Sequence, residues 1–215
     1  MPIFRRDGVS ILFVHIPKTG GSSVDDAFRD AGWSVALHDG GGGRDSLNRL
    51  RRCSPQHQHA AILESTLHVD RFDAIFTYVR EPTRRVVSEY VWRARKAAQP
   101  DVSGTAVEAW VRDSFAKVAT NPYWFDNHLR RQHEFLVPGT HTFRFEDGIE
   151  TGLARLAAAT GLDIPLSAPH RLKGSAMTGI DATDVVLTDA ARDMVIDFYR
   201  SDYERLGYPI PVPVG

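Results

Sequence analysis

The residues best suited to chemistry lie in one short turn near the start of the chain, Lys18-Thr19-Gly20-Gly21-Ser22-Ser23. An apolar run precedes this turn and a helical pattern follows it. Glycines let the backbone turn tightly and expose N–H groups, and the start of a helix directs unpaired N–H groups and a positive dipole end at the same point. Lys18 adds a full charge, and Thr19, Ser22 and Ser23 add hydroxyl donors. The turn is expected to bind a phosphate or a group of similar shape.

The order of residues in the turn differs from that of a Walker A loop. A Walker A loop carries its lysine late, followed by a Ser or Thr that holds Mg²⁺, whereas Lys18 precedes the glycines here. The alternative to an anion site is an ordinary surface turn, capped by Ser22 or Ser23, with a solvated lysine.

A second segment, residues 80–90, repeats the same logic. Arg80 ends an apolar run, Pro82 suits a first helical turn, and Ser88 follows about two helical turns after Arg80. Ligands of open α/β sheets bind at the carboxyl ends of the strands. Two anion sites at one sheet edge would fit a nucleotide with phosphate groups at both ends.

The elements that position these residues alternate between strands and helices. Buried strands are predicted at residues 10–16 and 74–79, with further strands at 34–37 and 140–145. Helices are predicted at residues 22–31, 46–53, 106–119 and 152–160, from Pro82 to a break at 99–104, and from the N-cap Thr188 to about Arg205. This order predicts one α/β domain over residues 1–215, with a central parallel sheet flanked by helices on both faces.

Composition narrows the class of protein. The 215 residues are 42% hydrophobic and 25% charged, which is ordinary for a globular domain. A net charge of −1 gives no general attraction to nucleic acid or to an anionic membrane, so an anion site must be a local cluster. A single cysteine excludes an internal disulfide. No targeting segment or membrane span is evident, which predicts a cytoplasmic protein; the sequence does not determine the oligomeric state.

With both motifs in view, the chain resembles sulfotransferases that use 3′-phosphoadenosine 5′-phosphosulfate. Residues 15–23 match the family's strand and Lys-Thr-Gly/Ser turn, and residues 80–90 match its R-D-P-x-x-R-x-x-S-x-Y segment, with Glu81 in place of Asp. The closest subgroup is the family 2 type, similar to heparan sulfate 2-O-sulfotransferase and short bacterial relatives. Such proteins have the fold type of the P-loop NTPases.

The resemblance implies a role for each motif. Lys18 would neutralise the leaving phosphate, and Thr19, Gly20, Gly21, Ser22 and Ser23 would hold the 5′-phosphate. Arg80 and Ser88 would hold the 3′-phosphate, and Lys173 lies in a loop that often closes over the nucleotide. Because a sulfuryl group carries less charge than a phosphoryl group, no metal is expected. The acceptor would be a small molecule or, more specifically, a carbohydrate.

The general base is the less certain assignment. The family carries its catalytic histidine in a His-x-His pair, which His57 and His59 match, and His59 is the better candidate. His57 would then be a substrate or structural contact, and Glu64 is the reserve base. Both histidines would otherwise be ordinary residues of a polar loop.

Several other features have both a functional and an ordinary interpretation. The four glycines at 40–43 form either a flexible connector or a lid. Arg49, Arg51 and Arg52 would meet an anionic acceptor or lie on a solvated helix face. The competing functions are a P-loop-like nucleotide kinase or ATPase, and a non-catalytic nucleotide-binding module.

Overall fold

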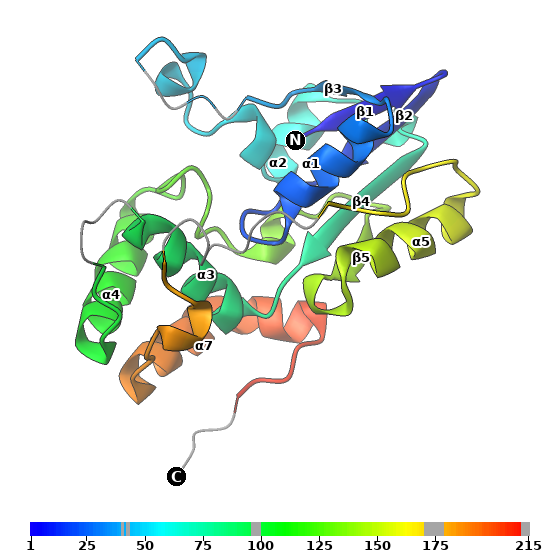
Figure 1. Cartoon of the computed structure of the whole chain (residues 1–215). Helices are drawn as coiled ribbons and strands as arrows, with labels where there is room; N and C mark the ends of the chain where they lie inside the picture. The colour runs from blue at the N-terminus through cyan, green and yellow to red at the C-terminus, as the bar shows by residue number, and fades with distance from the viewer. Residues whose placement is uncertain (40, 42–43, 96–99, 170–178, 212–215) are drawn as a thin grey trace.

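The protein has one open sheet with helices on both faces (Figure 1). The computed structural model describes residues 1–39, 41, 44–95, 100–169 and 179–211. Within these residues the sheet has five strands in the order β3-β1-β2-β4-β5. The strands are β1 (Ile3–Arg6), β2 (Val9–Phe13), β3 (Ser34–Ala36), β4 (Ala74–Val79) and β5 (His141–Arg144).

The sheet is mixed, which corrects the expectation of a parallel sheet. Strands β2, β4 and β5 pair in parallel as predicted, but β1 pairs antiparallel with both β2 and β3. Asp7 and Gly8 join β1 to β2 with φ values of 50° and 86°. Two positive φ angles are typical of the two-residue turn that suits a β-hairpin. The sequence prediction missed β1 because its four residues include two arginines.

The described helices are α1 (Gly21–Asp30), α2 (Ala60–Thr66), α3 (Pro82–Ala94), α4 (Gly104–Thr120), α5 (Ile149–Thr160) and α7 (Asp189–Leu206). Figure 1 shows α1 and α5 against one face of the sheet, with α3, α4 and α7 together on the other side. The predicted helices at 106–119 and 188–205 are thus confirmed to within two residues, and Thr188 caps α7 through its side chain.

Two apolar clusters hold the helices on the sheet. On the first face, Val24 and Phe28 of α1 and Leu153 of α5 pack against Phe13 and Phe76. On the second face, Val86 of α3 and Val195 of α7 belong to one cluster with Leu12 and Ile75. Alternate residues of β2 and β4 therefore face opposite layers, as expected for strands covered on both sides.

The segment between α1 and β4 departs most from the prediction. The helix predicted at residues 46–53 is a single 3₁₀ turn at Leu47–Leu50, in which the Ser46 hydroxyl accepts from the Asn48 N–H. The segment that carries the Leu47–Leu50 turn projects from the body of the molecule in Figure 1.

Further 3₁₀ turns lie at Pro55–His57, Val69–Arg71, Gln132–Phe135, Phe145–Asp147 and Ala182–Asp184.

The strand order sets the position of the two motifs. Because β2 and β4 are parallel neighbours, their carboxyl ends lie at the same edge of the sheet. The turn at residues 18–23 follows β2, and Arg80 follows β4 directly. Among the described helices, none is long and apolar enough to cross a membrane.

Candidate active site

The turn at residues 18–23 forms an open cradle at the start of α1. Lys18 and Gly20 have φ values of 70° and 87°, so the chain passes twice through the left-handed region before the helix begins. The N-cap residue of α1 is Gly20, which has no side chain to cap the helix. The first N–H groups of a helix lack partners within it, so this start is suited to the anion that the sequence predicts here.

His15 makes this cradle dependent on glycine. A methyl group on Gly21 would lie 1.9 Å from Nε2 of His15, and one on Gly20 would lie 2.8 Å from the Phe145 ring. His15 is buried, and burial holds its pKa well below the ordinary value, so the ring is neutral. The turn therefore rests directly on an uncharged imidazole.

The three hydroxyl groups of the turn have different surroundings. Thr19 is fully buried, and its hydroxyl donates to the carbonyl of Ile16 at 2.8 Å. This hydroxyl thus holds the turn together from within. Ser22 is exposed and Ser23 is half-buried. These two remain suited to the predicted role of phosphate donors.

Arg80 joins the second motif to the first. Its Nη1 donates to the carbonyl of Lys18 at 3.2 Å, and its guanidinium lies 4.8 Å from the centre of the Phe145 ring. Its Nε is buried and, among the described residues, has no hydrogen-bond partner. An unpaired buried donor costs about 1–3 kcal/mol, so this group is well suited to an incoming anion.

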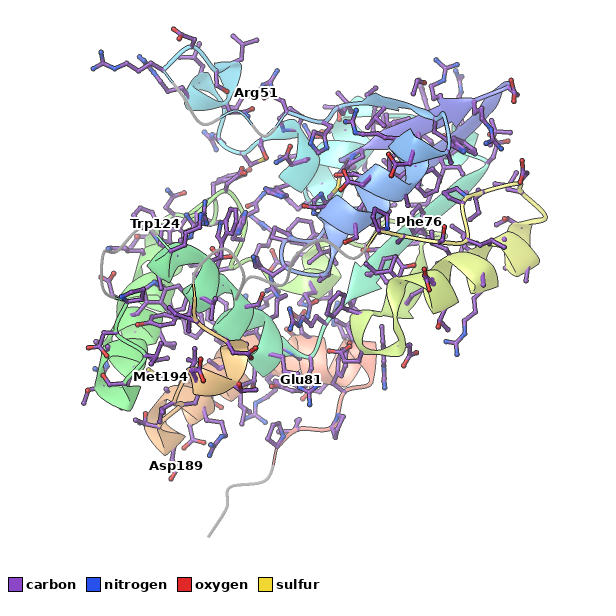
Figure 2. The ribbon with its side chains drawn as sticks, viewed as in Figure 1. Arg51, Phe76, Glu81, Trp124, Asp189 and Met194 are labelled. Carbon is purple, nitrogen blue, oxygen red and sulfur yellow. The ribbon has the colours of Figure 1, made fainter. Side chains whose placement is uncertain are left out.

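Two neighbouring side chains fix the backbone around Arg80. The amide of Gln132 accepts from the Arg80 N–H at 2.9 Å and donates to the Arg80 carbonyl at 2.8 Å. Glu81 caps α3, accepting from the N–H groups of Thr83 and Arg84 at 3.0 and 2.6 Å. Glu81, labelled in Figure 2, therefore performs the capping role in this segment despite its extra methylene.

Ser88 lies on α3, one turn before Trp92, and both are half-buried. The Lys18 ammonium lies 4.6 Å from the centre of the Trp92 indole. Since residues four apart share a helix face, Lys18 reaches the face that carries Ser88. The structure thus brings Lys18, Arg80 and the Ser88 face together.

Glu89 provides the negative charge beneath this cluster. It is buried, and its carboxylate accepts from Nε of Arg93 at 2.6 Å and pairs with Nδ1 of His128 at 2.7 Å. Burial alone would raise the pKa of Glu89, but His128, Arg93 and Lys18 lower it to about 2. Burial, together with Arg80, Arg95 and Arg93, lowers the pKa of Lys18 to about 8, while Glu89 opposes that shift.

The histidine pair divides into a buried and a partly exposed member. Nδ1 of His57 lies 2.7 Å from a carboxylate oxygen of Asp126, which also accepts from the Ser54 hydroxyl at 2.7 Å. Burial lowers the pKa of His57 to about 4. Its ring meets those of His15 and His128 edge-on, at centroid distances of 5.1 and 4.8 Å. His57 therefore lies next to His15, the residue that packs against the turn at residues 18–23.

His59 and Glu64 lie on the outer side of this segment. His59 is the N-cap residue of α2; its Nδ1 has no partner among the described residues, and its ring centre lies 5.8 Å from that of Tyr123. Burial and Arg130 lower the pKa of His59, so the ring is neutral near pH 7. Glu64 is exposed. Lys173 and the glycines at 40, 42 and 43 lie outside the described residues.

A strained turn holds the histidine segment in place. Phe125, Asp126 and Asn127 have φ values of 55°, 59° and 63°, and each such residue costs about 1–2 kcal/mol. The buried Asn127 amide donates to the carbonyl of His57 at 2.8 Å. Sequence reasoning missed Asp126 and Glu89 because nothing in their local pattern distinguishes them from solvated carboxylates.

The arginines of the projecting segment border a cavity of about 330 Å³ next to Asp126. Its wall includes Arg49, Arg51, Arg52 and Ser54. Figure 2 labels Arg51 on this segment and Trp124 on the loop that follows α4. Among the described residues, His57, Asp126 and His128 also place ligand-type atoms within 4.8 Å of one another, an arrangement that their hydrogen bonds already explain.

The family comparison agrees with this geometry. A family model described as "Sulfotransferase family" matches residues 1–209 of the 215. The chain belongs to this sulfotransferase family. The match covers both anion motifs and the histidine pair, and it confirms the family 2-type resemblance. No curated protein and no solved structure matches this sulfotransferase significantly. Family membership supports a transferase that moves sulfuryl groups.

Proposed function

We propose that this sulfotransferase moves a sulfuryl group from 3′-phosphoadenosine 5′-phosphosulfate to a hydroxyl group of a carbohydrate. The observation that carries the proposal is the 3.2 Å hydrogen bond from Arg80 to the carbonyl of Lys18. These two residues are 62 positions apart in the sequence. The two motifs thereby lie side by side at one sheet edge, which supports a single ligand that contacts both. Enzymes of this family generally use this donor.

The residues of the cradle have different roles toward the donor. The N–H groups at the start of α1, with Ser22 and Ser23, bind the 5′-phosphate. The Lys18 ammonium neutralises the charge that grows on the bridging oxygen as the bond to sulfur breaks. Arg80, with its unpaired Nε, and Ser88 hold the 3′-phosphate. Because each group is held before the donor arrives, alignment costs little at the moment of reaction.

His59 is the proposed general base, because it is neutral near pH 7 and less buried than His57. It takes the proton of the attacking hydroxyl. His57, fixed by Asp126, orients the segment that carries His59. Arg49, Arg51 and Arg52 line the cavity next to Asp126, where their charges suit an anionic acceptor. Independence from metal ions and a cytoplasmic location remain predictions of this proposal.

Thermal unfolding with the product nucleotide tests the donor. 3′-Phosphoadenosine 5′-phosphate at one hundred times its Kd should raise Tm by about 5 °C or more without magnesium, since a ligand bound to the folded state stabilises it. Lys18→Ala and Arg80→Ala should each reduce this shift. Lys117→Ala and Arg112→Ala, on the exposed face of α4, are matched controls that should not.

Turnover on a panel of oligosaccharides tests the reaction itself. His59→Ala should lower kcat by about 10²–10⁴-fold while leaving nucleotide binding intact. A Tm shift with magnesium-ATP and none with the bisphosphate would support the kinase or ATPase instead. Tight binding of the bisphosphate without turnover on any carbohydrate would favour a binding module.

A further inference from the structure

The proposed leaving-group lysine meets an aromatic face before any substrate is present. Its ammonium lies 4.6 Å from the centre of the Trp92 ring, and the Arg95 guanidinium lies over the same indole. The Lys18 backbone is held in the left-handed region at φ 70°. A lysine rarely adopts this conformation without support from its surroundings. The conformation of the turn sets the direction of the Lys18 side chain, and the ammonium group contacts the indole of Trp92.

This lysine needs such support to stay charged. Burial and three neighbouring cations, Arg80, Arg95 and Arg93, all disfavour the ammonium form, and they bring its pKa to about 8. The carboxylate of Glu89 favours the ammonium form. The face of an indole also attracts a cation. Each favourable contact therefore keeps a larger fraction of Lys18 charged near pH 8.

Building on the proposed function, we propose that Trp92 is the positioning residue of Lys18, whose indole face holds the ammonium charged and directed at the donor phosphate. The same helix face carries Ser88 one turn earlier. One face of α3 thus positions the groups for both phosphates of the donor: Ser88 directly and Lys18 through Trp92. A neutral Lys18 would bind the phosphate weakly, so the indole contributes to donor affinity at neutral pH.

Substitutions that separate packing from electrostatics test this role. Trp92→Phe keeps an aromatic face, whereas Trp92→Leu fills much of the space without one. The fraction of Lys18 that reacts with trace acetic anhydride, followed against pH by peptide mass spectrometry, reports the ionisation of Lys18 independently of activity. Trp92→Leu should lower the midpoint by about 0.5–1 pH unit, and Trp92→Phe by clearly less. Glu89→Gln should lower it as well.

The kinetics of the two Trp92 variants should differ in the same way as the Lys18 midpoints. At pH 8, Trp92→Leu should reduce kcat/KM for the donor by about two- to fivefold, as the smaller charged fraction of Lys18 requires. The alkaline limb of the pH profile of kcat/KM should move to lower pH, because that profile reports the free enzyme. Trp92→Phe should restore most of both. Lys117, paired with Asp113 on α4, is labelled in the same samples and should keep its midpoint in every variant.

An unchanged Lys18 midpoint in Trp92→Leu would overturn the proposal, and so would an equal shift in Trp92→Phe. Trp92 is half-buried, and unchanged circular dichroism would show that each variant folds. The labelling experiment needs no substrate. Failure of the wild-type protein to bind the bisphosphate would therefore overturn the proposed function, while the labelling result would still decide the role of Trp92.

Discussion

The two histidines of the His-x-His pair differ in their hydrogen-bond partners and in their roles. His57 donates its Nδ1 proton to Asp126, which leaves Nε2 as the unprotonated nitrogen. Burial keeps this ring neutral, and the same hydrogen bond helps to lower the pKa of Asp126 to about 2. The pair is thus a neutral imidazole on a carboxylate, which suits a positioning role. His59 has no such partner on its buried Nδ1 among the described residues, so no carboxylate fixes its ring in the same way.

This difference predicts how stability depends on pH. The pKa of His57 falls from 6.5 to about 4 on folding, so between those values the unfolded chain binds a proton that the folded chain excludes. Stability should fall as pH drops from about 6.5 to 4, by on the order of 3 kcal/mol from this group, with no contribution above that window. His57→Gln keeps a donor for Asp126 and should make this slope shallower in urea unfolding from pH 7 to pH 4.5, leaving the part that comes from His15, whose pKa burial also lowers.

The exposed His68→Gln variant is the control, and its slope should match that of the wild-type protein. The window for Asp126 lies lower, as pH falls through its folded pKa of about 2, so the two groups are separable. A slope in His57→Gln as steep as in the wild-type protein would contradict the role of His57.

At the scale of elements, the decisive contact is that of α1 with the end of β2. The helix begins on Gly21, directly against the ring of His15, and its far end packs through Phe28 on Phe4 at a centroid distance of 3.9 Å. The close approach at the start fixes where the first N–H groups of α1 point. The aromatic stack at the other end fixes the tilt of the helix against the sheet. Together they set the cradle without help from a side-chain cap.

Gly21→Ala should therefore damage the site far more than an ordinary helix substitution. The added methyl would lie 1.9 Å from Nε2 of His15, so either the ring or the start of α1 must move. We expect affinity for the bisphosphate to fall by about a hundredfold, since the loss of aligned donors to an anion costs about 2–3 kcal/mol. Isothermal titration calorimetry would measure it.

Gly32→Ala, just beyond the other end of α1, is the matched control. Its φ of 80° makes alanine strained there, but a methyl group would meet nothing within 4 Å. It should lower the free energy of unfolding by about 1 kcal/mol and leave nucleotide affinity unchanged. Equal loss of affinity in both variants would mean that helix stability, not the contact with His15, controls the site.

Elements with a local sequence pattern could be predicted, whereas contacts between distant segments could not. Strand β4 (Ala74–Val79) was predictable to the residue because six apolar or small residues end at an arginine, and Thr188 marked α7 by its capping chemistry. The two anion motifs were readable because each is local. Asp126, Glu89 and Trp92 act through contacts with residues 39 to 74 positions away in the sequence, which no local pattern encodes. The hairpin strand β1 was too short and too basic to stand out.

At the scale of the whole molecule, the charge distribution is unequal even though the sum is nearly neutral. The net charge is −1, yet Lys18, Arg80, Arg93 and Arg95 lie close enough to influence one another, with Glu89 as the main counter-charge. Glu146 offsets Arg80 from the other side. Such a local excess of positive charge raises the concentration of an anionic substrate at the site without making the whole protein basic.

This distribution predicts a salt dependence that belongs to the site. Arg95 follows α3 at the edge of the cluster and makes no ion pair among the described residues, so its charge acts mainly through the local field. Arg95→Gln should weaken bisphosphate binding at 0.05 M salt by about three- to tenfold and reduce the slope of log Kd against log salt. Arg112→Gln removes an equal charge from α4, where Arg112 pairs with Glu108, and should change neither. Because both variants lower the net charge by one, a common change in slope would assign the attraction to the overall charge, whereas a change in Arg95→Gln alone would assign it to the cluster around Lys18.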